Sequence, residues 1–585
     1  MLNLEKRAFS LYNRNKEGAY IMEYLEKVQL WKNNPNLEPN LKKELDSMND
    51  NELKEAFTTD LEFGTGGLRG ILGAGTNRMN IYIVAKATLG FGRYLMKQSP
   101  VALSKGVAIS HDNRHQSVEF ARISAEVLSS LGFRVFLFEA LRPTPELSYA
   151  VRYFHCIGGI MITASHNPKE YNGYKIYDET GCQLVPSDAD KVIAEINQID
   201  DYFNIEHGKN HELIHYIGKE VDEAYIKEVK KIILRPNLKK DFKLVYTPLH
   251  GTGQVFAPQV LQSVGYDVVP LACQMTCDPD FSGVKTSNPE NKEAYDEAIE
   301  LAKEIGASIV LATDPDADRL GIAVLHNGEY VLFTGNQTAS LIFDYICRTR
   351  KELGTLPSDG YMFTTNVSST LPIAIAEKYG LKTEITLTGF KFIGEKAREM
   401  ELTHRGTYVF GFEESYGCLV SDCVRDKDSI QAILMLCETA AYYREKGMDL
   451  VDALNQIYEE YGYYKEGITN IGLKGLEGAA KIKRIMDFFR TTDIALKDFK
   501  ILAKDDVKLG IKTDLTTDKK TKINLPSSNV IKYYLNDNMW FVLRPSGTEP
   551  KLKVYYGVKG NTQKEADQKL DKLTGEVLSI VNMIK

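Results

Sequence analysis

Val107-Ala-Ile-Ser-His-Asp-Asn-Arg-His-Gln116 opens a unit that appears three times along the chain. The apolar residues 107–110 predict a short strand, and the polar residues after them lead into a predicted helix that ends at Gly132. A second strand is expected at residues 135–138. A glycine that ends a helix between two apolar runs is typical of a β-α-β unit in a parallel sheet.

Residues 244–269 and 361–385 show the same order of features. Each begins with a short apolar run, continues through a polar loop and a helix, and reaches a glycine, Gly265 or Gly380, before the next apolar run. Chance likeness between α/β segments is the alternative explanation. The repeat predicts an α/β fold with three related mixed-sheet domains in series.

A second polar loop follows each copy, directly after another apolar run. Ser165 comes as far after Gly132 as Glu413 comes after Gly380. Because ligands bind beyond the carboxyl ends of parallel strands, three loops in one structural position predict domains arranged around a central cleft. These loops are Thr163-Ala-Ser-His-Asn-Pro168, Thr313-Asp-Pro-Asp-Ala-Asp-Arg319 and Gly411-Phe-Glu-Glu-Ser-Tyr-Gly417.

The N-terminal part of the chain differs from these repeats. Residues 1–60 read as a helical, polar-rich extension, with Ile21, Leu25, Val28 and Trp31 on one apolar face. We expect this extension to be structural.

The C-terminal part predicts a separate α+β domain. Strands are expected at Met539–Leu543 and Leu552–Tyr556, with Arg544-Pro-Ser-Gly-Thr-Glu-Pro-Lys551 between them. Thr562 and Glu565 predict a capping box at the start of a closing helix. The predicted domains are 1–210 for the extension with the Ser165 domain, then 211–325, 326–455 and 456–585.

The composition excludes several classes of protein. The chain has 585 residues, 43% of them hydrophobic, and a net charge of −7, which argues against a basic nucleic-acid platform. No apolar run reaches the roughly 18–20 residues of a membrane span, and no secretory signal precedes the first domain. The eight cysteines form no C-x-x-C pair, so neither zinc nor a disulfide framework is indicated. Free thiols in a chain without an export signal predict a cytoplasmic protein.

Ser165 is the candidate nucleophile. It follows an apolar strand and lies beside His166 and Asn167. A hydroxyl next to an imidazole at a strand end favours phosphoryl transfer, whereas an ordinary loop is the alternative because serine and asparagine are common turn residues. Asn172-Gly173 predicts a tight turn that returns Lys175 towards Ser165.

Asp314, Asp316 and Asp318 are candidate metal ligands. Three carboxylates after a buried strand suit a hard cation such as Mg²⁺ or Ca²⁺, and Arg319 occupies the position where an EF-hand needs glycine. A solvated acidic turn is the alternative. Arg319 suits a phosphate that bridges the guanidinium and the cation.

Three further segments could bind phosphate or sugar. Arg544, Ser546, Gly547 and Thr548 fit a phosphate dianion, or else a simple hairpin turn. The loop with Glu413 and Ser415 suits sugar hydroxyls, or else is only a charged loop. Lys391 follows Thr388-Gly-Phe, and Arg69 lies in a glycine-rich segment that lacks the context of a nucleotide-binding loop.

Taken together, these motifs resemble the α-D-phosphohexomutase family, most closely its phosphoglucomutase/phosphopentomutase branch. The resemblance covers the chain from about residue 60 and rests on the motifs around Ser165, Asp314, Glu413 and Arg544, in the family's order. It implies four domains around a central cleft, a phosphoserine at Ser165, and Mg²⁺ held by the three aspartates. Phe412 departs from the glycine that many glucose and mannose mutases have there.

The resemblance also implies roles for the remaining candidates. Glu413 and Ser415 would hold sugar hydroxyls, and Arg544 with Ser546 to Thr548 would hold the phosphate that does not react. The positions near the transferring phosphate or in proton transfer would be Arg69, His166, Lys175 and Lys391.

The predicted reaction interconverts glucose 1-phosphate and glucose 6-phosphate through glucose 1,6-bisphosphate. Ribose, deoxyribose or mannose phosphates are the alternative substrates. A serine phosphatase with two metals is disfavoured, because the sequence shows no set of metal-binding histidines. An aspartyl-phosphate enzyme built on Asp314 is disfavoured as well, because it would need threonine at the position of Asp318. A sugar-phosphate sensor without activity is the last alternative. The only partners expected are sugar phosphates, without nucleic acid or membrane, and the state expected is a monomer or weak dimer.

Overall fold

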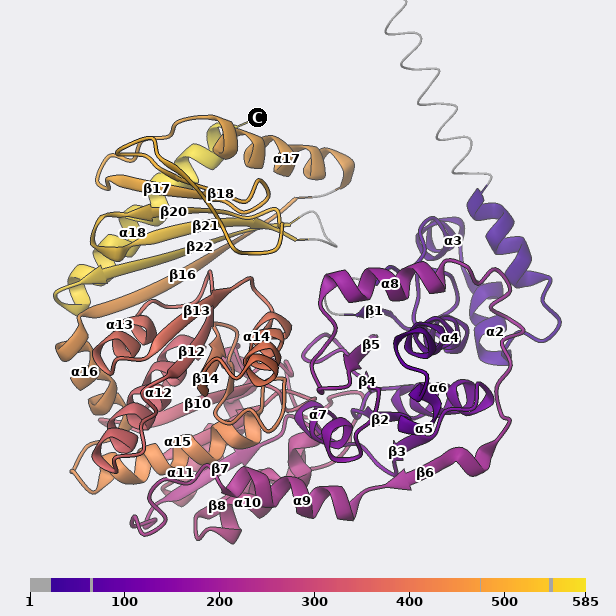
Figure 1. The fold of residues 1–585 in the computed structure, drawn as a ribbon, viewed down its shortest axis with the longest axis horizontal. Coiled ribbons are helices and arrows are strands. Elements are labelled where there is room, and N and C mark those ends of the chain that lie inside the picture. Colours follow the sequence, from indigo (N-terminus) through magenta and orange to yellow (C-terminus); the bar gives the residue numbers. More distant parts are fainter. Residues whose placement is uncertain (1–22, 64–66, 474, 547–550, 585) are drawn as a thin grey trace, which may run out of the picture.

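The computed structural model describes residues 23–63, 67–473, 475–546 and 551–584 (Figure 1). Three α/β units and a C-terminal unit follow one another along the chain, each built on one sheet. The described part of the chain has no helix with both the length and the apolar character that a membrane span needs.

The first sheet has a parallel centre and two antiparallel strands at one edge. Its strands in spatial order are β1 (Leu68–Ile71), β5 (Tyr171–Asp178), β4 (Gly158–Ile162), β2 (Val107–His111), β3 (Val135–Phe138) and β6 (Ile214–Ile217). Strands β2, β3, β4 and β6 are parallel, because the connections between them cross over through helices. Ile109 and Ile160 pack on one face of this sheet, and Ala108 and Met161 on the other.

The second and third sheets repeat the arrangement of the first. The second contains β11 (Glu329–Phe333), β10 (Leu320–His326), β9 (Ile309–Thr313), β7 (Lys243–Thr247) and β8 (Asp267–Pro270). The third contains β13 (Lys382–Thr386), β12 (Gly360–Thr365), β14 (Thr407–Glu413) and β15 (Gly417–Leu419). The orders β5-β4-β2-β3, β10-β9-β7-β8 and β15-β14-β12-β13 match one for one, so the predicted repeat and fold class are confirmed.

Helices cover both faces of the α/β sheets and one face of the last sheet (Figure 1). Residues 23–32 are also helical. The other α-helices are α2 (Pro39–Ser47), α3 (Asp50–Phe57), α4 (Ile81–Gln98), α5 (Ala102–Lys105), α6 (Ser117–Ser130), α7 (Thr144–Tyr153), α8 (Pro186–Ile196), α9 (Lys219–Lys230), α10 (Ala257–Ser263), α11 (Asp296–Ile305), α12 (Gly335–Glu352), α13 (Leu371–Lys378), α14 (Phe390–Thr403), α15 (Ser429–Arg444), α16 (Leu450–Tyr461), α17 (Gly475–Thr491) and α18 (Gln563–Met583).

The C-terminal unit is an antiparallel sheet with α18 and α17 packed on one face. Trp540, Val542 and Tyr555 on its other face pack against Val367 and Leu387 of the third unit. This is the predicted α+β domain. Its strands in spatial order are β16 (Tyr463–Gly472), β22 (Lys551–Gly560), β21 (Trp540–Pro545), β20 (Ile531–Leu535), β17 (Ile501–Asp506), β18 (Ile511–Asp514) and β19 (Lys520–Lys522).

Two predictions of local structure need correction. Thr562 does cap α18 by accepting from the Glu565 N–H, but the Glu565 carboxylate accepts from Asn561 and not from Thr562. The N-terminal apolar face is partly wrong: Val28 and Trp31 are buried, whereas Leu25 is 43% exposed. Ile21 lies outside the described residues.

The predicted domain divisions at residues 210, 325 and 455 stay predictions. Two strands bear on where they fall. Strand β6 hydrogen-bonds to β3 after residue 210, and β11 hydrogen-bonds to β10 after residue 325. We propose that the first and second domains extend at least to Ile217 and Phe333.

The expected turn at Asn172-Gly173 is wrong. Both residues lie inside β5, between β1 and β4, and the chain reverses earlier, in the loop 163–170. The local Asn-Gly signal is overridden because Gly173 fills a position without space for a side chain: an added Cβ would meet the carbonyl oxygens of Thr163 and Leu68. Lys175 still reaches the site, because β5 runs back along β4.

Gly173→Ala should therefore destabilise the protein by about 1–3 kcal/mol, because the methyl group would push β5 away from both neighbouring strands. Urea-induced unfolding of the full chain measures this change. Gly472→Ala on β16 is the matched control, since no described atom lies within 4 Å of its added Cβ, and its stability should change by less than about 0.5 kcal/mol. Equal stability of the two variants would contradict the close approach.

Candidate active site

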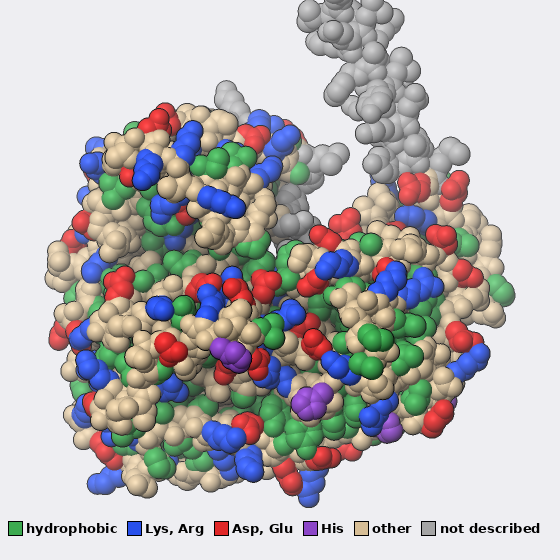
Figure 2. All heavy atoms as spheres, viewed as in Figure 1, with side chains coloured by type: hydrophobic (Ala, Val, Ile, Leu, Met, Phe, Trp, Pro, Cys, Tyr) green, Lys and Arg blue, Asp and Glu red, His purple; other side chains and the backbone are tan. Residues whose placement is uncertain are grey.

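All four units face one cleft with a cavity of about 850 Å³. Figure 2 shows the molecule hollowed between the C-terminal unit at upper left and the first unit at right. The cleft brings together most of the predicted site residues. Those lining it are Arg69, Ser165, His166, Lys175, Asp318, Arg319, Lys391, Glu413, Ser415 and Arg544.

The remaining predicted residues lie beside or outside this lining. Asp314 and Asp316 are fully buried beneath the cleft. Ser546 closes the end of the β21–β22 hairpin, where its N–H donates to the Lys551 carbonyl at 2.7 Å. Gly547 and Thr548 lie outside the described residues.

Ser165 occupies the loop between β4 and β5 in a left-handed conformation, with φ of 51°. Its N–H donates to Thr163 Oγ1 at 2.8 Å, which helps to hold this conformation. Its Oγ donates to Asp314 Oδ2 at 2.8 Å and lies 3.2 Å from His166 Nδ1. The serine of one unit therefore points directly at the acidic loop of the next unit.

Arg114 holds the Ser165 loop in place. Its guanidinium donates to the carbonyl oxygens of Ser165, Asn167, Pro168 and Tyr171, between 2.5 and 3.1 Å. The side chain is fully buried and forms an ion pair of 3.3 Å with Asp112. Sequence reasoning placed Arg114 in the polar run after β2 but gave it no role. Its only sequence signal is that position at a strand's carboxyl end.

Asp314, Asp316 and Asp318 converge because their loop curls tightly. Asp314 Oδ1 accepts from the N–H groups of Asp318 and Arg319 at 3.1 and 3.0 Å. One ligand atom from each carboxylate lies within 4.8 Å of the others. All three are buried, which rules out the solvated acidic turn that the sequence left open.

In two of the carboxylates, one oxygen contacts a lysine ammonium, and the other accepts no hydrogen bond from the described residues. Asp316 Oδ2 accepts from Lys175 Nζ at 2.8 Å and from Thr144 Oγ1 at 3.0 Å, while its Oδ1 accepts no hydrogen bond from any described residue. Asp318 Oδ2 pairs with Lys427 Nζ at 3.1 Å, and its Oδ1 likewise accepts no hydrogen bond from a described residue, although Arg319 Nε lies 3.7 Å away. Buried, unbonded carboxylate oxygens are costly unless a cation meets them. The three residues therefore fit a hard metal ion.

The aspartates repel one another. Burial first, then Asp318 and Asp316, raise the pKa of Asp314 well above its ordinary value. Burial would also raise the pKa of Asp316, but Lys175 outweighs it and lowers that pKa. A bound cation would relieve the repulsion that remains.

Three basic groups of the cleft differ in the direction in which their pKa is shifted. Burial would lower the pKa of Lys175, yet Asp316 and Asp318 outweigh it and raise that pKa, so its ammonium stays charged. Burial lowers the pKa of Lys391 to about 8. Burial, and then Arg319 and Arg69, lower the pKa of His166 well below its usual value, so the imidazole is neutral. Of the two predicted lysines, only Lys391 can exchange a proton near neutral pH.

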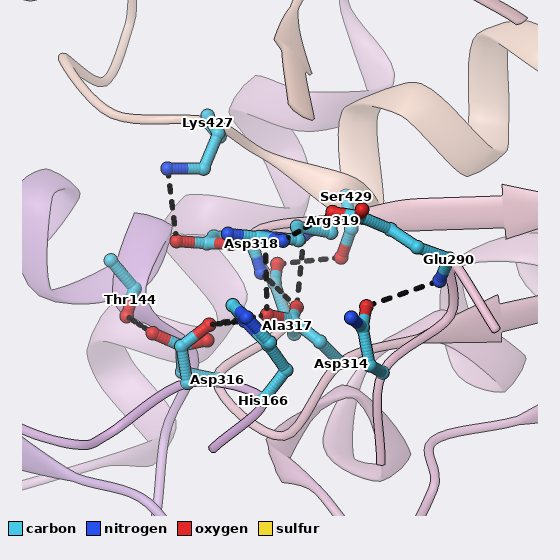
Figure 3. A network of polar contacts seen from close by, with 12 residues as sticks. Thr144, His166, Glu290, Asp314, Asp316, Ala317, Asp318, Arg319, Lys427 and Ser429 are labelled. Atoms are coloured by element: carbon cyan, nitrogen blue, oxygen red, sulfur yellow. Dashed lines mark hydrogen bonds and ion pairs between the residues drawn. The ribbon is translucent and has the colours of Figure 1, made fainter. Parts of the chain in front are cut away.

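Side chains from the first and third units fix the acidic loop from two sides (Figure 3). The Thr144 N–H at the start of α7 donates to the Asp316 carbonyl at 2.9 Å, in addition to the side-chain bond. At the start of α15, Ser429 Oγ donates to the Ala317 carbonyl at 2.5 Å. The acidic loop is thus positioned by three units together.

Lys427 belongs to the candidate site but was not predicted from the sequence. Its Nζ lies 3.1 Å from Asp318 Oδ2 and 3.6 Å from Glu413 Oε1. Gly417 leaves the space for its stem, since an added Cβ there would overlap the lysine side chain. The lysine therefore joins the acidic loop to the candidate sugar loop, and the sequence carried no signal for this contact.

The sugar loop is partly held by its own unit. The Glu414 carboxylate accepts from Thr365 Oγ1 at 3.1 Å and Ser368 Oγ at 3.0 Å, so it anchors the loop. Glu413 is buried at the cleft wall and Ser415 lines the cleft. Glu413 and Ser415 are thus placed to contact a ligand.

The C-terminal wall of the cleft is basic. Arg544 on β21 lies directly opposite Lys553 on β22, and Lys551 is on the same strand. Burial, followed by Arg544 and Lys551, lowers the pKa of Lys553. These three cations form no ion pair within the described residues, which suits an anion. Lys553 was missed from the sequence, although strand alternation places it beside Arg544.

Arg69 completes the entrance to the Ser165 loop. It lies on β1, and its Nη1 donates to Asn167 Oδ1 at 3.0 Å. The glycine-rich segment before it is described only from Gly67 onward. The predicted contact of an anion with the backbone amides of this segment involves residues 64–66, which lie outside the described residues.

Family models match the chain in four consecutive segments. Their descriptions are phosphoglucomutase/phosphomannomutase alpha/beta/alpha domains I, II and III and the C-terminal domain of the same family. The matched residues are 60–203, 223–328, 334–461 and 490–573, respectively.

The chain is similar to curated relatives over most of its length. It is 40% identical to a phosphoglucomutase of Staphylococcus epidermidis over 86% of this chain and 92% of that protein. It is 38% identical to a phosphoglucomutase of Staphylococcus aureus over 90% of this chain and 94% of that one.

Solved structures share the fold. A putative phosphomannomutase from Thermus thermophilus superposes with a TM-score of 0.66 at 24% identity, covering 90% of this chain and 99% of that one. The open form of the Paramecium phosphoprotein pp63/parafusin gives a TM-score of 0.67 at 19% identity, covering 90% and 95%.

Arg114→Lys should loosen the Ser165 loop, because an ammonium cannot reach the four carbonyl oxygens that the guanidinium holds. Losing about two charge-assisted hydrogen bonds should speed hydrogen exchange of amides 165–171 by about 10- to 100-fold. Exchange followed by mass spectrometry measures this. Arg122→Lys on the exposed face of α6 is the control, and unchanged exchange in the Arg114 variant would contradict the role.

Proposed function

The chain belongs to the phosphoglucomutase/phosphomannomutase family, and from this membership we propose that it interconverts glucose 1-phosphate and glucose 6-phosphate. The proposed route passes through a phosphoserine at Ser165 and through glucose 1,6-bisphosphate. The hydrogen bond from Ser165 Oγ to Asp314 Oδ2 carries this proposal, because it puts the candidate nucleophile against the acidic loop inside the cleft. The choice of glucose rests on the relatives named phosphoglucomutase.

The first half-reaction moves a phosphoryl group from Ser165 to the sugar. The bond between phosphorus and Ser165 Oγ breaks, and a bond forms from phosphorus to the free hydroxyl oxygen of the sugar phosphate. The hydroxyl proton passes to neutral Lys391 Nζ. The bisphosphate then turns in the cleft, and its other phosphoryl group returns to Ser165 Oγ. In the first transfer the departing Ser165 Oγ takes up a proton from Asp314 or His166, which both contact it. In the second transfer the serine hydroxyl returns that proton, and protonated Lys391 Nζ gives its proton to the sugar oxygen that loses the phosphoryl group.

The charged side chains around Ser165 would offset most of the negative charge on the transferring phosphoryl group. We assign the metal site of Asp314, Asp316 and Asp318 to Mg²⁺, which when bound would offset charge on the transferring group. Arg319 directs its guanidinium to the same place. Lys175 stays protonated and offsets the charge of Asp316.

The rest of the cleft binds the parts of the substrate that do not react. Arg544 and Ser546, with Gly547 and Thr548 outside the described residues, would hold the second phosphate, and Lys553 adds a cation there. Glu413 and Ser415 would accept hydrogen bonds from sugar hydroxyls. Arg69 would contact the transferring phosphate near Asn167.

A direct assay tests the substrate. Turnover of glucose 1-phosphate, primed with glucose 1,6-bisphosphate, should exceed turnover of ribose 1-phosphate and mannose 1-phosphate. Faster reaction of either competitor would move the assignment to that sugar. Release of inorganic phosphate as the main product would indicate a phosphatase. A cytoplasmic location and a monomeric or weakly dimeric state stay predictions.

Ser165→Ala should abolish turnover, since among the described residues no other hydroxyl donates to Asp314 and could carry the phosphoryl group there. Mass spectrometry of the wild-type protein, incubated with glucose 1,6-bisphosphate, should find phosphate on the peptide that contains Ser165. Ser263→Ala, on the exposed side of α10, is the control. Full turnover by the Ser165 variant would rule out the phosphoserine route.

Lys391 should give the first half-reaction its pH dependence. Burial lowers its pKa to about 8, and only the neutral amine accepts a proton, so transfer from phosphorylated Ser165 should rise with pH and level off above pH 8. Lys391→Met should be slower by about 10²- to 10⁴-fold and lose this inflection. Single-turnover measurements from pH 6 to 9 provide the profile.

The control for this profile is Lys396→Met, because Lys396 lies on the same helix but pairs with Glu399 at 2.7 Å and outside the cleft lining. Its profile should match that of the wild type. An inflection that persists in the Lys391 variant would assign the proton transfer to another group.

A further inference from the structure

We propose that Glu290 is a positioning residue that aims the Arg319 guanidinium at the transferring phosphoryl group. This inference rests on the proposed function, because it assumes that Arg319 contacts that group. Glu290 lines the cleft, although no sequence motif singled it out.

The Arg319 guanidinium is hydrogen-bonded to Glu290 through one of its nitrogens and lies over the acidic loop (Figure 3). Nη1 donates to Glu290 Oε1 at 2.6 Å. Nε is buried and donates no hydrogen bond to a described residue, although it lies 3.9 Å from Asp314 Oδ2 and 3.7 Å from Asp318 Oδ1. Because Asp314 Oδ2 accepts from Ser165 Oγ and also lies 3.9 Å from Arg319 Nε, the guanidinium is near the position that a phosphoryl group on Ser165 would take.

Glu290 is itself held by a rigid turn. Its N–H donates to Asn288 Oδ1 at 3.1 Å, and the Asn288 N–H donates to Thr286 Oγ1 at 3.2 Å. Tyr295, which is buried, donates from its hydroxyl to the Pro289 carbonyl at 2.8 Å. The turn therefore has its own hydrogen bonds and does not depend on Arg319 for its shape.

The turn is also fixed relative to the acidic loop. Gly321 lies two residues after Arg319, at the start of β10, directly against this turn. An added Cβ at Gly321 would meet the Tyr295 hydroxyl and, at 2.8 Å, the Pro289 carbonyl. The backbone on both sides of the Glu290–Arg319 pair is thus set by close packing, which fixes the distance between the two side chains.

The position of the guanidinium matters because arginine has many rotamers. Nearby carboxylates of Asp314 and Asp318 would compete with the phosphoryl group for an unrestrained guanidinium. A charge-assisted bond to one arm removes most of this freedom and leaves the remaining donors in a defined direction. Such preorganisation acts on the transfer step more than on sugar binding.

The alternative is that Glu290 contacts the sugar itself, since its side chain is 34% exposed in the cleft. In that case its loss would raise KM and would act independently of Arg319. If it acts only through Arg319, its loss should lower kcat and have no effect once Arg319 is gone. A double-mutant cycle separates the two roles.

The experiment compares Glu290→Ala, Glu290→Gln, Arg319→Ala and the Arg319→Ala/Glu290→Ala double variant, with glucose 1-phosphate as substrate. Glu290→Ala should lower kcat by about 10- to 100-fold with KM changed less than about threefold. Glu290→Gln keeps a carbonyl acceptor and should recover part of the loss. In the Arg319→Ala background, Glu290→Ala should cost less than about twofold.

Glu293→Ala is the matched control, because Glu293 is exposed in the short 3-10 helix Lys292–Ala294 directly after the turn and should leave kcat unchanged. Three results would each overturn the inference: a double variant whose loss is the product of the two single losses, a Glu290→Ala variant with mainly a raised KM, or a Glu290→Ala variant with normal kcat. Normal kcat for Arg319→Ala would overturn it as well and would place the failure in the proposed role of Arg319.

Discussion

The mutual repulsion of three buried carboxylates is the constraint on which the site depends. Asp314, Asp316 and Asp318 are almost completely removed from water, where each negative charge costs several kcal/mol unless it is paired. The acidic loop itself does not supply enough positive charge to offset these three carboxylates. Lys175 comes from the first unit and Lys427 from the third, and a cation fits the oxygens that remain. The convergence of three domains therefore meets an electrostatic requirement of the acidic loop.

Backbone hydrogen bonds between the units hold the three loops in fixed positions relative to one another. The Asp316 carbonyl accepts from Thr144 of the first unit, and the Leu320 N–H donates to the Tyr416 carbonyl of the sugar loop at 2.9 Å. In each unit the functional loop follows the same strand of the repeat and the chain then returns on an antiparallel strand, β5, β10 or β15. Three copies of one unit therefore present the loops with Ser165, Asp314 and Glu413 at matching strand ends, as the proposed function requires.

The sequence allowed the repeat and most of the site to be predicted, because both depend on local patterns. Apolar runs, helix-ending glycines and polar loops are readable one segment at a time. The contacts of Arg114 and Lys427 were not predicted, because each involves residues that are distant in the sequence or lie in another loop. Asn172-Gly173 misled for the same reason: its turn signal is local, whereas strands on both sides decide its conformation.

Lys175 and Lys391 show why residue type alone does not assign a proton-transfer role. Each was an equal candidate in the sequence, and both are buried in the structure. Burial beside Asp316 and Asp318 keeps Lys175 charged, so it can offset charge but cannot accept a proton. Burial of Lys391 beside Phe392, without an ion pair among the described residues, lowers its pKa instead. The difference in pKa between the two lysines thus follows from where the acidic loop lies.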